Sequence, residues 1–361
     1  MATHQTLLSP AELAYLHSSL SLTPPVRADG RAPTQFRPLT AETGILPGTN
    51  GSARVCFSDG TEAIVGVKAE IEKTPGIHDA DEAGDKLNAI ASAERPDEKR
   101  TSREWLEMTI EIPGQRDDEA STVFLAEMLR EALLADREFA KKLWINRRFH
   151  WRLYLDVLLI SPPLSYPLPL LSLTTHLALL ATRLPRLKSE GDEDPMFDDD
   201  WESSEFLYPR EGAATGSRPP ITLLVTTVAG NIIFDPSREE LAVAESALAV
   251  SVSEIRAQRE SGEMDVDSSS REIQLLSMRT IDPPSRLTPP GVPNSENVAT
   301  NGGALAKQQG PDVHQEHVEG VWKAPLGGTK YAVLESILDA VLEKGGVVDD
   351  ILDALDGVEL T

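Results

Sequence analysis

The sequence contains one cysteine, Cys56, among its 361 residues. A single thiol excludes an intramolecular disulfide and any zinc site built from several cysteines, and it is typical of a chain in a reducing compartment. Basic residues are also scarce, since 34 Lys and Arg stand against 58 Asp and Glu and give a formal net charge of −24. Most of the surface would therefore repel polyphosphate, and any contact with nucleic acid has to be local.

Several signatures of catalysis are missing. The chain has no Gly-rich phosphate loop of the Walker or dinucleotide type, no Gly-x-Ser-x-Gly elbow and no His-Glu-x-x-His helix. The acidic stretch 191–206 lacks the oxygen spacing, central glycine and terminal glutamate of a calcium loop, so residues 189–218 are expected to form a solvated acidic loop. His150 and His176 are expected to be structural. Residues 1–10 lack the basic start and apolar core of a signal peptide, which favours the cytoplasm or nucleus.

The apolar stretch 146–188 predicts a buried strand followed by a central helix. Residues 149–160 first alternate and then become wholly apolar, as in a strand that enters a core. Two prolines end that strand. Leucines at three- and four-residue steps over 170–184 predict the helix, with Pro167 and Pro169 in its first turn and Pro185 at its end. The stretch 164–184 has about the length of a membrane span, but the prolines, His176 and Arg183 favour a soluble core helix.

Hydrophobic periodicity predicts further elements on both sides of this stretch. Helices are expected over residues 9–20, 120–136, 329–342 and 347–355, and strands over 36–43, 51–58, 61–72, 105–112, 220–228 and 231–234. Asp59-Gly60 and Ala229-Gly230 are typical of hairpin turns. Residues 239–256 are ambiguous between helix and strand, and a turn followed by a strand that pairs with 272–281 is expected.

Two polar stretches divide the chain. Residues 75–102 are expected to be a loop or insertion, and 282–319, which include His314 and His317, to be disordered. The expected organisation is a main domain over 1–281 with loop insertions about 75–102 and 189–218, a linker over 282–319 and a C-terminal helical segment over 320–361. Because an isolated short helix is marginal in water, that segment should pack on the main domain.

Five short motifs together carry a family resemblance. They are Arg27-x-Asp29-Gly30-Arg31, Asn50-Gly51-Ser52-Ala53-Arg54-Val55, Val65-Gly66-Val67-Lys68-Ala69-Glu70, Tyr154-x-Asp156-Val157-Leu158-Leu159 and Thr182-Arg183-x-Pro185. With the order of elements, they resemble the RNase PH family, and in detail the RNase PH-like ring subunits of the RNA exosome of the ribosomal RNA-processing protein 42 type. The likeness spans about 9–256, with a looser match at 331–342.

The resemblance implies an α+β fold: an RNase PH-like domain with ribosomal protein S5 domain 2-like β-α-β-α architecture, here with a disordered insertion and a C-terminal helix. It further implies a six-member ring with other RNase PH-like exosome subunits, S1/KH-type cap subunits and an associated nuclease. Single-stranded RNA would pass through the central pore. No membrane, metal or cofactor is implied, and the expected localisation is nucleus, nucleolus and cytoplasm.

Active members of the family use carboxylates just beyond the Asp-Val-Leu-Leu strand and a Gly/Thr/Arg phosphate loop. Here residues 160–169 read ISPPLSYPLP, without Asp, Glu, Gly, Thr or Arg. Phosphorolysis needs charge stabilisation of the transferring phosphoryl group, so a non-catalytic scaffold is expected. Two alternatives remain open, an active phosphate-dependent 3′-to-5′ exoribonuclease and an acidic adaptor that works outside a ring.

Basic residues are then the candidates for RNA contact. Arg147, Arg148 and Arg152 cluster around the start of the predicted central strand, and they should bind either RNA or the acids of a neighbouring subunit. From the residues alone, the turn 27–31 is either a surface turn with an internal ion pair or a site for phosphate or a partner carboxylate. Arg27, Asp29 and Arg31, together with Asp156 in the central strand, are assigned to a ring interface or a structural motif.

Overall fold

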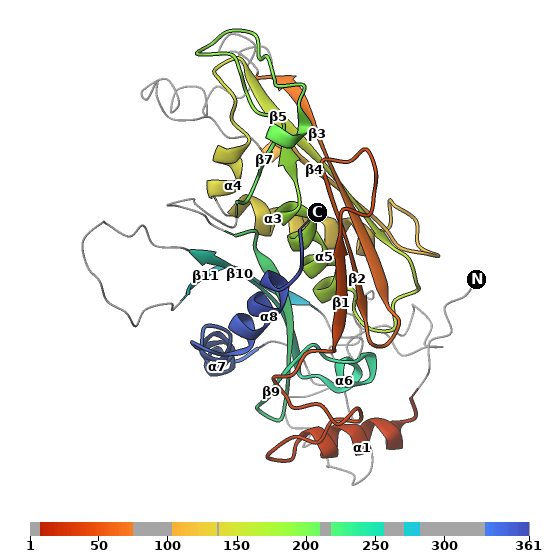
Figure 1. Ribbon diagram of the computed structural model, residues 1–361. Helices are drawn as coiled ribbons and strands as arrows, with labels where there is room; N and C mark the ends of the chain where they lie inside the picture. The colour runs from red at the N-terminus through yellow and green to blue at the C-terminus, as the bar shows by residue number, and fades with distance from the viewer. Residues whose placement is uncertain are drawn as a thin grey trace, which may run out of the picture.

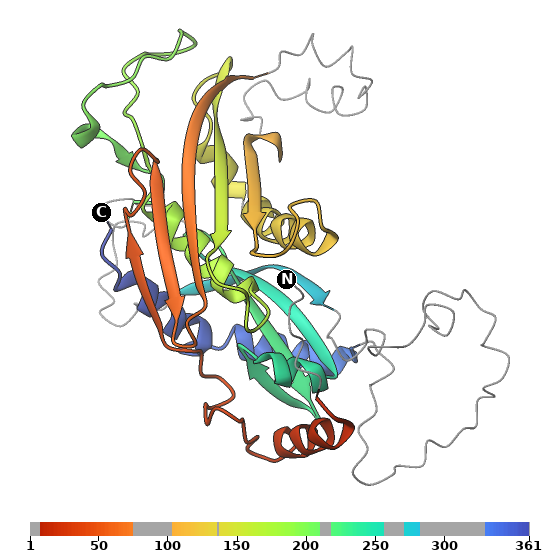
Figure 2. The same cartoon turned by 90° about the vertical axis from the view of Figure 1, so that its right-hand side faces the viewer.

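The computed structural model describes residues 8–74, 103–135, 137–209, 218–255, 271–281 and 329–360. Two β-sheets lie on opposite sides of a buried helix, with further helices at the edges (Figures 1 and 2). The mixed architecture confirms the α+β prediction. The expected loop 75–102 and the expected disordered segment 282–319, with His314 and His317, lie outside the described residues.

The first sheet has five strands in the order β1-β2-β3-β5-β4. Their bounds are β1 Leu39–Thr43, β2 Gly51–Phe57, β3 Glu62–Lys73, β4 Leu106–Glu111 and β5 Phe149–Leu159. The hairpin around Asp59-Gly60 is confirmed, since β2 and β3 pair antiparallel and Gly60 has a positive φ of 84°. Only β4 and β5 run parallel, joined through α3 (Ala120–Ala135) and α4 (Arg137–Lys142). The pairing places β5 inside the sheet.

The second sheet has four antiparallel strands in the order β11-β10-β8-β9. They are β8 Ile221–Val228, β9 Asn231–Phe234, β10 Ser246–Ile255 and β11 Glu272–Ile281. The expected hairpin of β8 and β9 and the pairing of β10 with β11 are confirmed. The prediction of a turn before β10 was wrong. A short helix, α6 (Arg238–Val243), lies there, and Ser237 and Glu240 form a capping box at its start.

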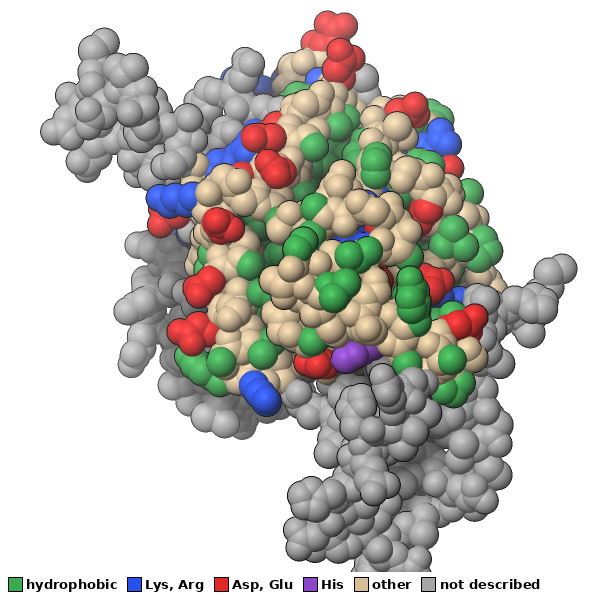
Figure 3. All heavy atoms as spheres, turned by 90° about the horizontal axis from the view of Figure 1, so that it is seen from below, with side chains coloured by type: hydrophobic (Ala, Val, Ile, Leu, Met, Phe, Trp, Pro, Cys, Tyr) green, Lys and Arg blue, Asp and Glu red, His purple; other side chains and the backbone are tan. Residues whose placement is uncertain are grey.

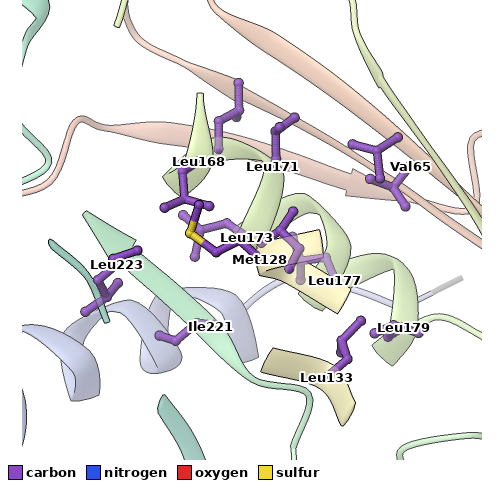
Figure 4. Close-up of a cluster of buried hydrophobic side chains, with 14 of the residues drawn as sticks. Val65, Met128, Leu133, Leu168, Leu171, Leu173, Leu177, Leu179, Ile221 and Leu223 are labelled. Carbon is purple, nitrogen blue, oxygen red and sulfur yellow. The ribbon is translucent and has the colours of Figure 1, made fainter. Parts of the chain in front are cut away.

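The helix between the sheets is α5, Leu168–Leu180, and all 13 of its residues are buried. It packs against β2 and β3 on one side and β8 on the other, and its leucines form the centre of the core (Figure 4). An apolar surface on every side is typical of a helix that is enclosed on every side. In the part of the chain that the structure describes, no helix is long and apolar enough to cross a membrane.

Two expectations about this region were wrong. The predicted helix ends at Leu180 and not near Pro185, because the backbone N–H of Arg183 donates to the carbonyl of Asn50 (2.8 Å) and β6 (Arg183–Leu184) pairs with β7 (Glu205–Phe206). The apolar end of β5 does not enter the core on both faces, since Leu158 and Ile160 are 40% and 44% exposed. One face of the sheet is open to solvent there.

Helices at the chain's ends cover the second sheet. The N-terminal α1 (Pro10–Leu20) has a capping box at Ser9 and packs on α6. At the other end, α7 (Tyr331–Val341) and α8 (Val347–Asp356) contribute buried side chains to the main hydrophobic core. Two single-turn 3-10 helices, η1 (Arg103–Trp105) and η2 (Trp201–Ser203), complete the elements. The domain boundaries at 281 and 320 stay predictions.

Candidate functional site

The turn from β5 to α5 lies in the stretch 160–169, which the family resemblance compares with the carboxylates and phosphate loop of active members. Ser161 anchors it, since its hydroxyl accepts a hydrogen bond from the backbone N–H of Glu62 (3.1 Å) and donates to the carbonyl of Gly60 (3.3 Å). Burial raises the pKa of Tyr166 to about 12, so its phenol stays neutral. The turn therefore presents no charged side chain of its own.

The N-terminus of α5 is also a poor anion site. Helix N-termini bind anions through unpaired backbone N–H groups. Here Pro167 is the N-cap, makes no side-chain cap, and like Pro169 carries no N–H. The neighbouring Leu168 and Leu170 are buried. Two donors are thus missing and apolar side chains fill the surroundings.

Arg37 reaches the turn from the irregular segment before β1, and the sequence analysis did not single it out. It donates to Ser165 Oγ (2.8 Å) and pairs with Asp235 (2.6 Å) and Asp59 (2.6 Å). Burial alone would lower the pKa of Arg37, but Asp235 and Asp59 together raise it above its ordinary value. Its charge is already balanced inside the chain. No local pattern indicated the pairing of Arg37 with Asp235, because the two residues lie 198 positions apart in the sequence.

The Arg27 motif lies beside this network. The Arg27 guanidinium is buried and donates to both carboxylate oxygens of Glu240, each at 2.8 Å, and to the carbonyls of Phe234 and Asp235. Arg31 pairs with Asp29 (2.5 Å) and with the buried Asp235 (2.8 Å). The motif thus ties the N-terminal segment to the second sheet. A role in a subunit interface stays a prediction.

The three candidate RNA-binding arginines lie at the start of β5, and each has an acidic neighbour within the chain. Arg148 contacts Asp194 (3.0 Å), and Arg147 contacts Asp192 more loosely (3.9 Å). Side chains of Arg147 and Arg148 remain 69% and 55% exposed. The structure therefore places Arg147 and Arg148 together at the surface. Their partners are aspartates of the same chain, whereas the sequence analysis expected RNA or the acids of a neighbouring subunit.

Arg152 lies farther along β5 and is more enclosed. It pairs with Glu107 of β4 (2.8 Å) and Glu72 of β3 (3.2 Å), and its side chain is 29% exposed. The hydrogen bond that it donates to the Glu107 carboxylate is the main reason that the pKa of Arg152 is raised. Arg152 therefore bridges three strands of the first sheet.

The acidic loop that contains Asp192 and Asp194, the partners of Arg147 and Arg148, is less exposed to solvent than expected. Its Phe197 ring lies 5.0 Å from the Trp151 ring, and the carbonyl of Glu193 accepts a hydrogen bond from the Asn146 side chain (2.9 Å). Asp192 and Asp194 themselves are exposed. The loop is thus held against the start of β5 by an aromatic contact that its acidic composition concealed.

The remaining candidates are separated from these arginines. Asp156 is exposed on the open face of the first sheet, where it accepts a hydrogen bond from Thr109 (2.7 Å). His150 is buried and stacks on Trp105 with 4.4 Å between ring centroids; this burial lowers its pKa. His176 is buried within α5. Among the described residues, no group of three His, Cys, Asp or Glu could hold a metal ion.

Comparison with known proteins identifies the family. Residues 35–185 match the model of the 3′ exoribonuclease family, domain 1. The exosome complex component RRP42 of Saccharomyces cerevisiae is 32% identical over 249 residues, 68% of this chain and 81% of that protein. Its Schizosaccharomyces pombe counterpart is 33% identical over 261 residues, covering 68% of this chain and 78% of that protein.

Solved structures that resemble the chain include an archaeal exosome core, with 18% identity, a TM-score of 0.47 and coverage of 75% of this chain and 84% of that one. An Archaeoglobus fulgidus exosome with RNA bound to the active site matches at 18% identity and a TM-score of 0.46, over 74% of this chain and 86% of that one. The match to the two fungal proteins spans most of the chain and confirms the predicted type. The chain therefore belongs to the RRP42 family of exosome components, within the RNase PH family.

Proposed function

We propose that this chain is a structural subunit of an RNA exosome ring that supports 3′-to-5′ RNA processing and degradation without catalysing phosphorolysis. The single observation that supports the absence of catalysis is the turn 160–169, which has neither a carboxylate nor a cationic side chain. The partners would be other RNase PH-like subunits, S1/KH-type cap subunits, an associated nuclease and single-stranded RNA. The same proposal places the subunit in the nucleus, nucleolus and cytoplasm.

The chemistry of the turn supports this assignment. A transferring phosphoryl group needs fixed positive charge, metal or backbone donors in position before the reaction. Arg37, which donates a hydrogen bond to Ser165 of the turn, already pairs with two carboxylates. Prolines at 167 and 169 remove two backbone donors. The turn can therefore connect β5 to α5 but offers phosphate little to bind.

A phosphorolysis assay tests the absence of catalysis. The purified full chain is incubated with inorganic phosphate and an oligoribonucleotide, and released nucleoside diphosphates are measured. We expect no release above that of a sample without protein. Phosphate-dependent shortening that is abolished by Ser161→Ala and Ser165→Ala together would instead establish the exoribonuclease alternative.

Co-purification distinguishes a ring subunit from an adaptor. The full chain is recovered from its native cells under mild salt, and the accompanying proteins are quantified. Stoichiometric recovery with several RNase PH-like chains is expected. Recovery as a lone monomer would favour the acidic adaptor and would contradict the ring assignment whatever the phosphorolysis assay shows.

We also propose that Arg147, Arg148 and Arg152 contact RNA. Exposed ion pairs contribute only about 0–1 kcal/mol, so RNA phosphates could displace the carboxylates of Asp192 and Asp194. Arg152, with two partners and less exposure, would contribute less than the other two.

RNA protection in the assembled ring tests this contact. Arg147→Glu and Arg148→Glu together should weaken the nuclease protection of bound RNA and reduce its salt dependence. Arg116→Glu is the matched control, because Arg116 is 83% exposed and also pairs with an aspartate, Asp118. Unchanged protection in the double variant would remove the RNA-contact proposal and leave ring membership untouched.

A further inference from the structure

The strand β1 forms one edge of the five-stranded sheet, and among the described residues no strand pairs with its outer side. The N–H of Gly44 donates to the carbonyl of Ser52 (3.0 Å), and the N–H of Ser58 donates to the carbonyl of Pro38 (2.8 Å). Ladder bonds alternate along an antiparallel pair, so the even-numbered residues of β1 bond to β2. The backbone groups of Leu39 and Ala41 therefore point away from the sheet.

Those backbone groups lie along a groove. A cavity of about 940 Å³ separates β1 from the C-terminal helix α8, and the two elements lie side by side in Figures 1 and 2. Its lining is largely apolar and includes Leu39, Ala41, Leu173, Ile351, Ala354 and Val358. The hydroxyl of Thr43 donates to the carbonyl of Glu359 (2.8 Å) and joins the two walls at one end.

Carboxylates surround the groove. Glu42, Asp350 and Glu359 are exposed and line it, and Glu42 lies 3.7 Å from Arg54. The one cation in the lining, Arg37, is paired with Asp235 and Asp59. This charge would repel a phosphate backbone and attract Lys or Arg. Figure 3 shows the molecule from below, where Lys and Arg side chains lie among acidic and hydrophobic ones.

We propose that this groove binds an extended peptide segment of a partner protein as a sixth strand of the first sheet. Unpaired edges accept strands because main-chain hydrogen bonds supply affinity, while alternate side chains supply specificity. Apolar side chains of the segment would enter the groove beside Leu39 and Ala41. Its Lys or Arg side chains would face the surrounding carboxylates. This inference does not depend on the proposed ring function.

A peptide that alternates valine and lysine over about nine residues is the probe. Its binding to the full chain is followed by fluorescence anisotropy. In an added strand, only every second N–H faces β1, so N-methylation of the valines or of the lysines should weaken binding about tenfold more than methylation of the other set. If methylation of the valines weakens binding more, the peptide runs antiparallel to β1. If methylation of the lysines weakens binding more, the peptide runs parallel to β1.

Substitutions of single residues test the location. Ala41→Arg fills the groove and should weaken binding by at least about tenfold. The matched control is Thr109→Arg, which adds the same charge at an exposed residue of β4, the opposite edge strand of the same sheet and outside the groove lining, and should change binding less than about twofold. Far-UV circular dichroism checks folding. Should Ala41→Arg unfold the chain, Ala354→Arg blocks the groove from the exposed side of α8.

Several results would overturn the proposal. They are absence of binding by the valine-lysine peptide, equal effects of the two methylation patterns, and unchanged affinity of the groove-filling variants. Equal or tighter binding of a valine-glutamate peptide or of oligouridylate would exclude a basic peptide as the partner.

Discussion

Arg27 and Glu240 show how a buried ion pair depends on its hydrogen bonds. Both side chains are almost fully enclosed, and each carboxylate oxygen accepts one guanidinium N–H at 2.8 Å. The remaining N–H groups of Arg27 reach backbone carbonyls, so the cost of removing the charges from water is offset by paired donors. Loss of Glu240 leaves the buried Arg27 with only the longer contact to Asp29 (3.8 Å), which does not replace the two hydrogen bonds.

Glu240→Ala should therefore lower the free energy of unfolding by about 3–5 kcal/mol, as for other broken buried pairs. Asp118→Ala, which breaks the exposed pair with Arg116, should cost about 0–1 kcal/mol. Urea unfolding followed by circular dichroism measures both. Equal losses in the two variants would show that Arg27 finds another partner when Glu240 is removed.

His176 places a titratable ring inside α5. Burial, with a smaller contribution from Arg218, lowers its pKa from 6.5 to about 4. Between these values the unfolded chain binds the proton more tightly than the folded chain. The stabilising neutral ring is fully present above pH 6.5, and its contribution is lost as the pH falls toward 4.

The free energy of unfolding should consequently fall by about 2 kcal/mol between pH 7 and pH 5 because of this one residue. His176→Leu should remove that part of the pH dependence, whatever its effect on stability at pH 7. Urea unfolding of both proteins at several pH values measures the difference in slope. Parallel curves would mean that His176 keeps an ordinary pKa in the folded chain.

At the scale of elements, two family motifs meet where β2 passes the end of α5. Gly51 lies so close to Thr182 that an added Cβ would be 2.5 Å from the Thr182 Cα. The side chain of the neighbouring Asn50 joins the two elements to β3. Its NH2 group donates to the Arg183 carbonyl (3.1 Å), and its carbonyl oxygen accepts from the Ala69 N–H (2.9 Å). The glycine is needed for this close approach of backbones.

Gly51→Ala should destabilise the chain by about 1–3 kcal/mol, as expected of overpacking against backbone. Gly66→Ala is the matched control in the adjacent strand, because its new Cβ would meet only side-chain atoms, the nearest being Leu46 Cδ1 at 3.1 Å. Thermal unfolding compares the two. A larger loss for Gly66→Ala would contradict the close-packing explanation.

The elements that the sequence predicted well are those with one dominant signal. Ser9 followed by Pro10 and Glu12 marked the start of α1, and Asp59-Gly60 marked the β2–β3 hairpin. The segment 239–256 carried two competing periodicities. The capping box at Ser237, just before this segment, stabilises a helix ahead of β10. Local patterns fail where two of them overlap within a few residues.

At the scale of the whole molecule, α5 joins the two sheets into one core. It contacts β2 and β3 of the first sheet and β8 of the second, and α8 belongs to the same hydrophobic cluster. Neither sheet can keep its apolar face covered once α5 leaves. The two sheets should therefore unfold together.

Coincident unfolding curves test this coupling. Trp105, Trp144 and Trp151 lie in or beside the first sheet, so their fluorescence should follow that sheet, while far-UV circular dichroism follows the whole chain. Both signals should change with one urea midpoint. An earlier midpoint for circular dichroism would show that the second sheet unfolds independently.

The sequence alone determined the strand and helix types of the core, the family and the absence of charged groups in the turn 160–169, because these depend on local periodicity and on residue identity. The tertiary structure decided which charges are available. It paired Arg27 with Glu240 and Arg37 with Asp235 across about two hundred residues, and it brought acidic residues to the candidate RNA-binding arginines. Contacts between distant residues depend on the packing of elements, which no local pattern encodes.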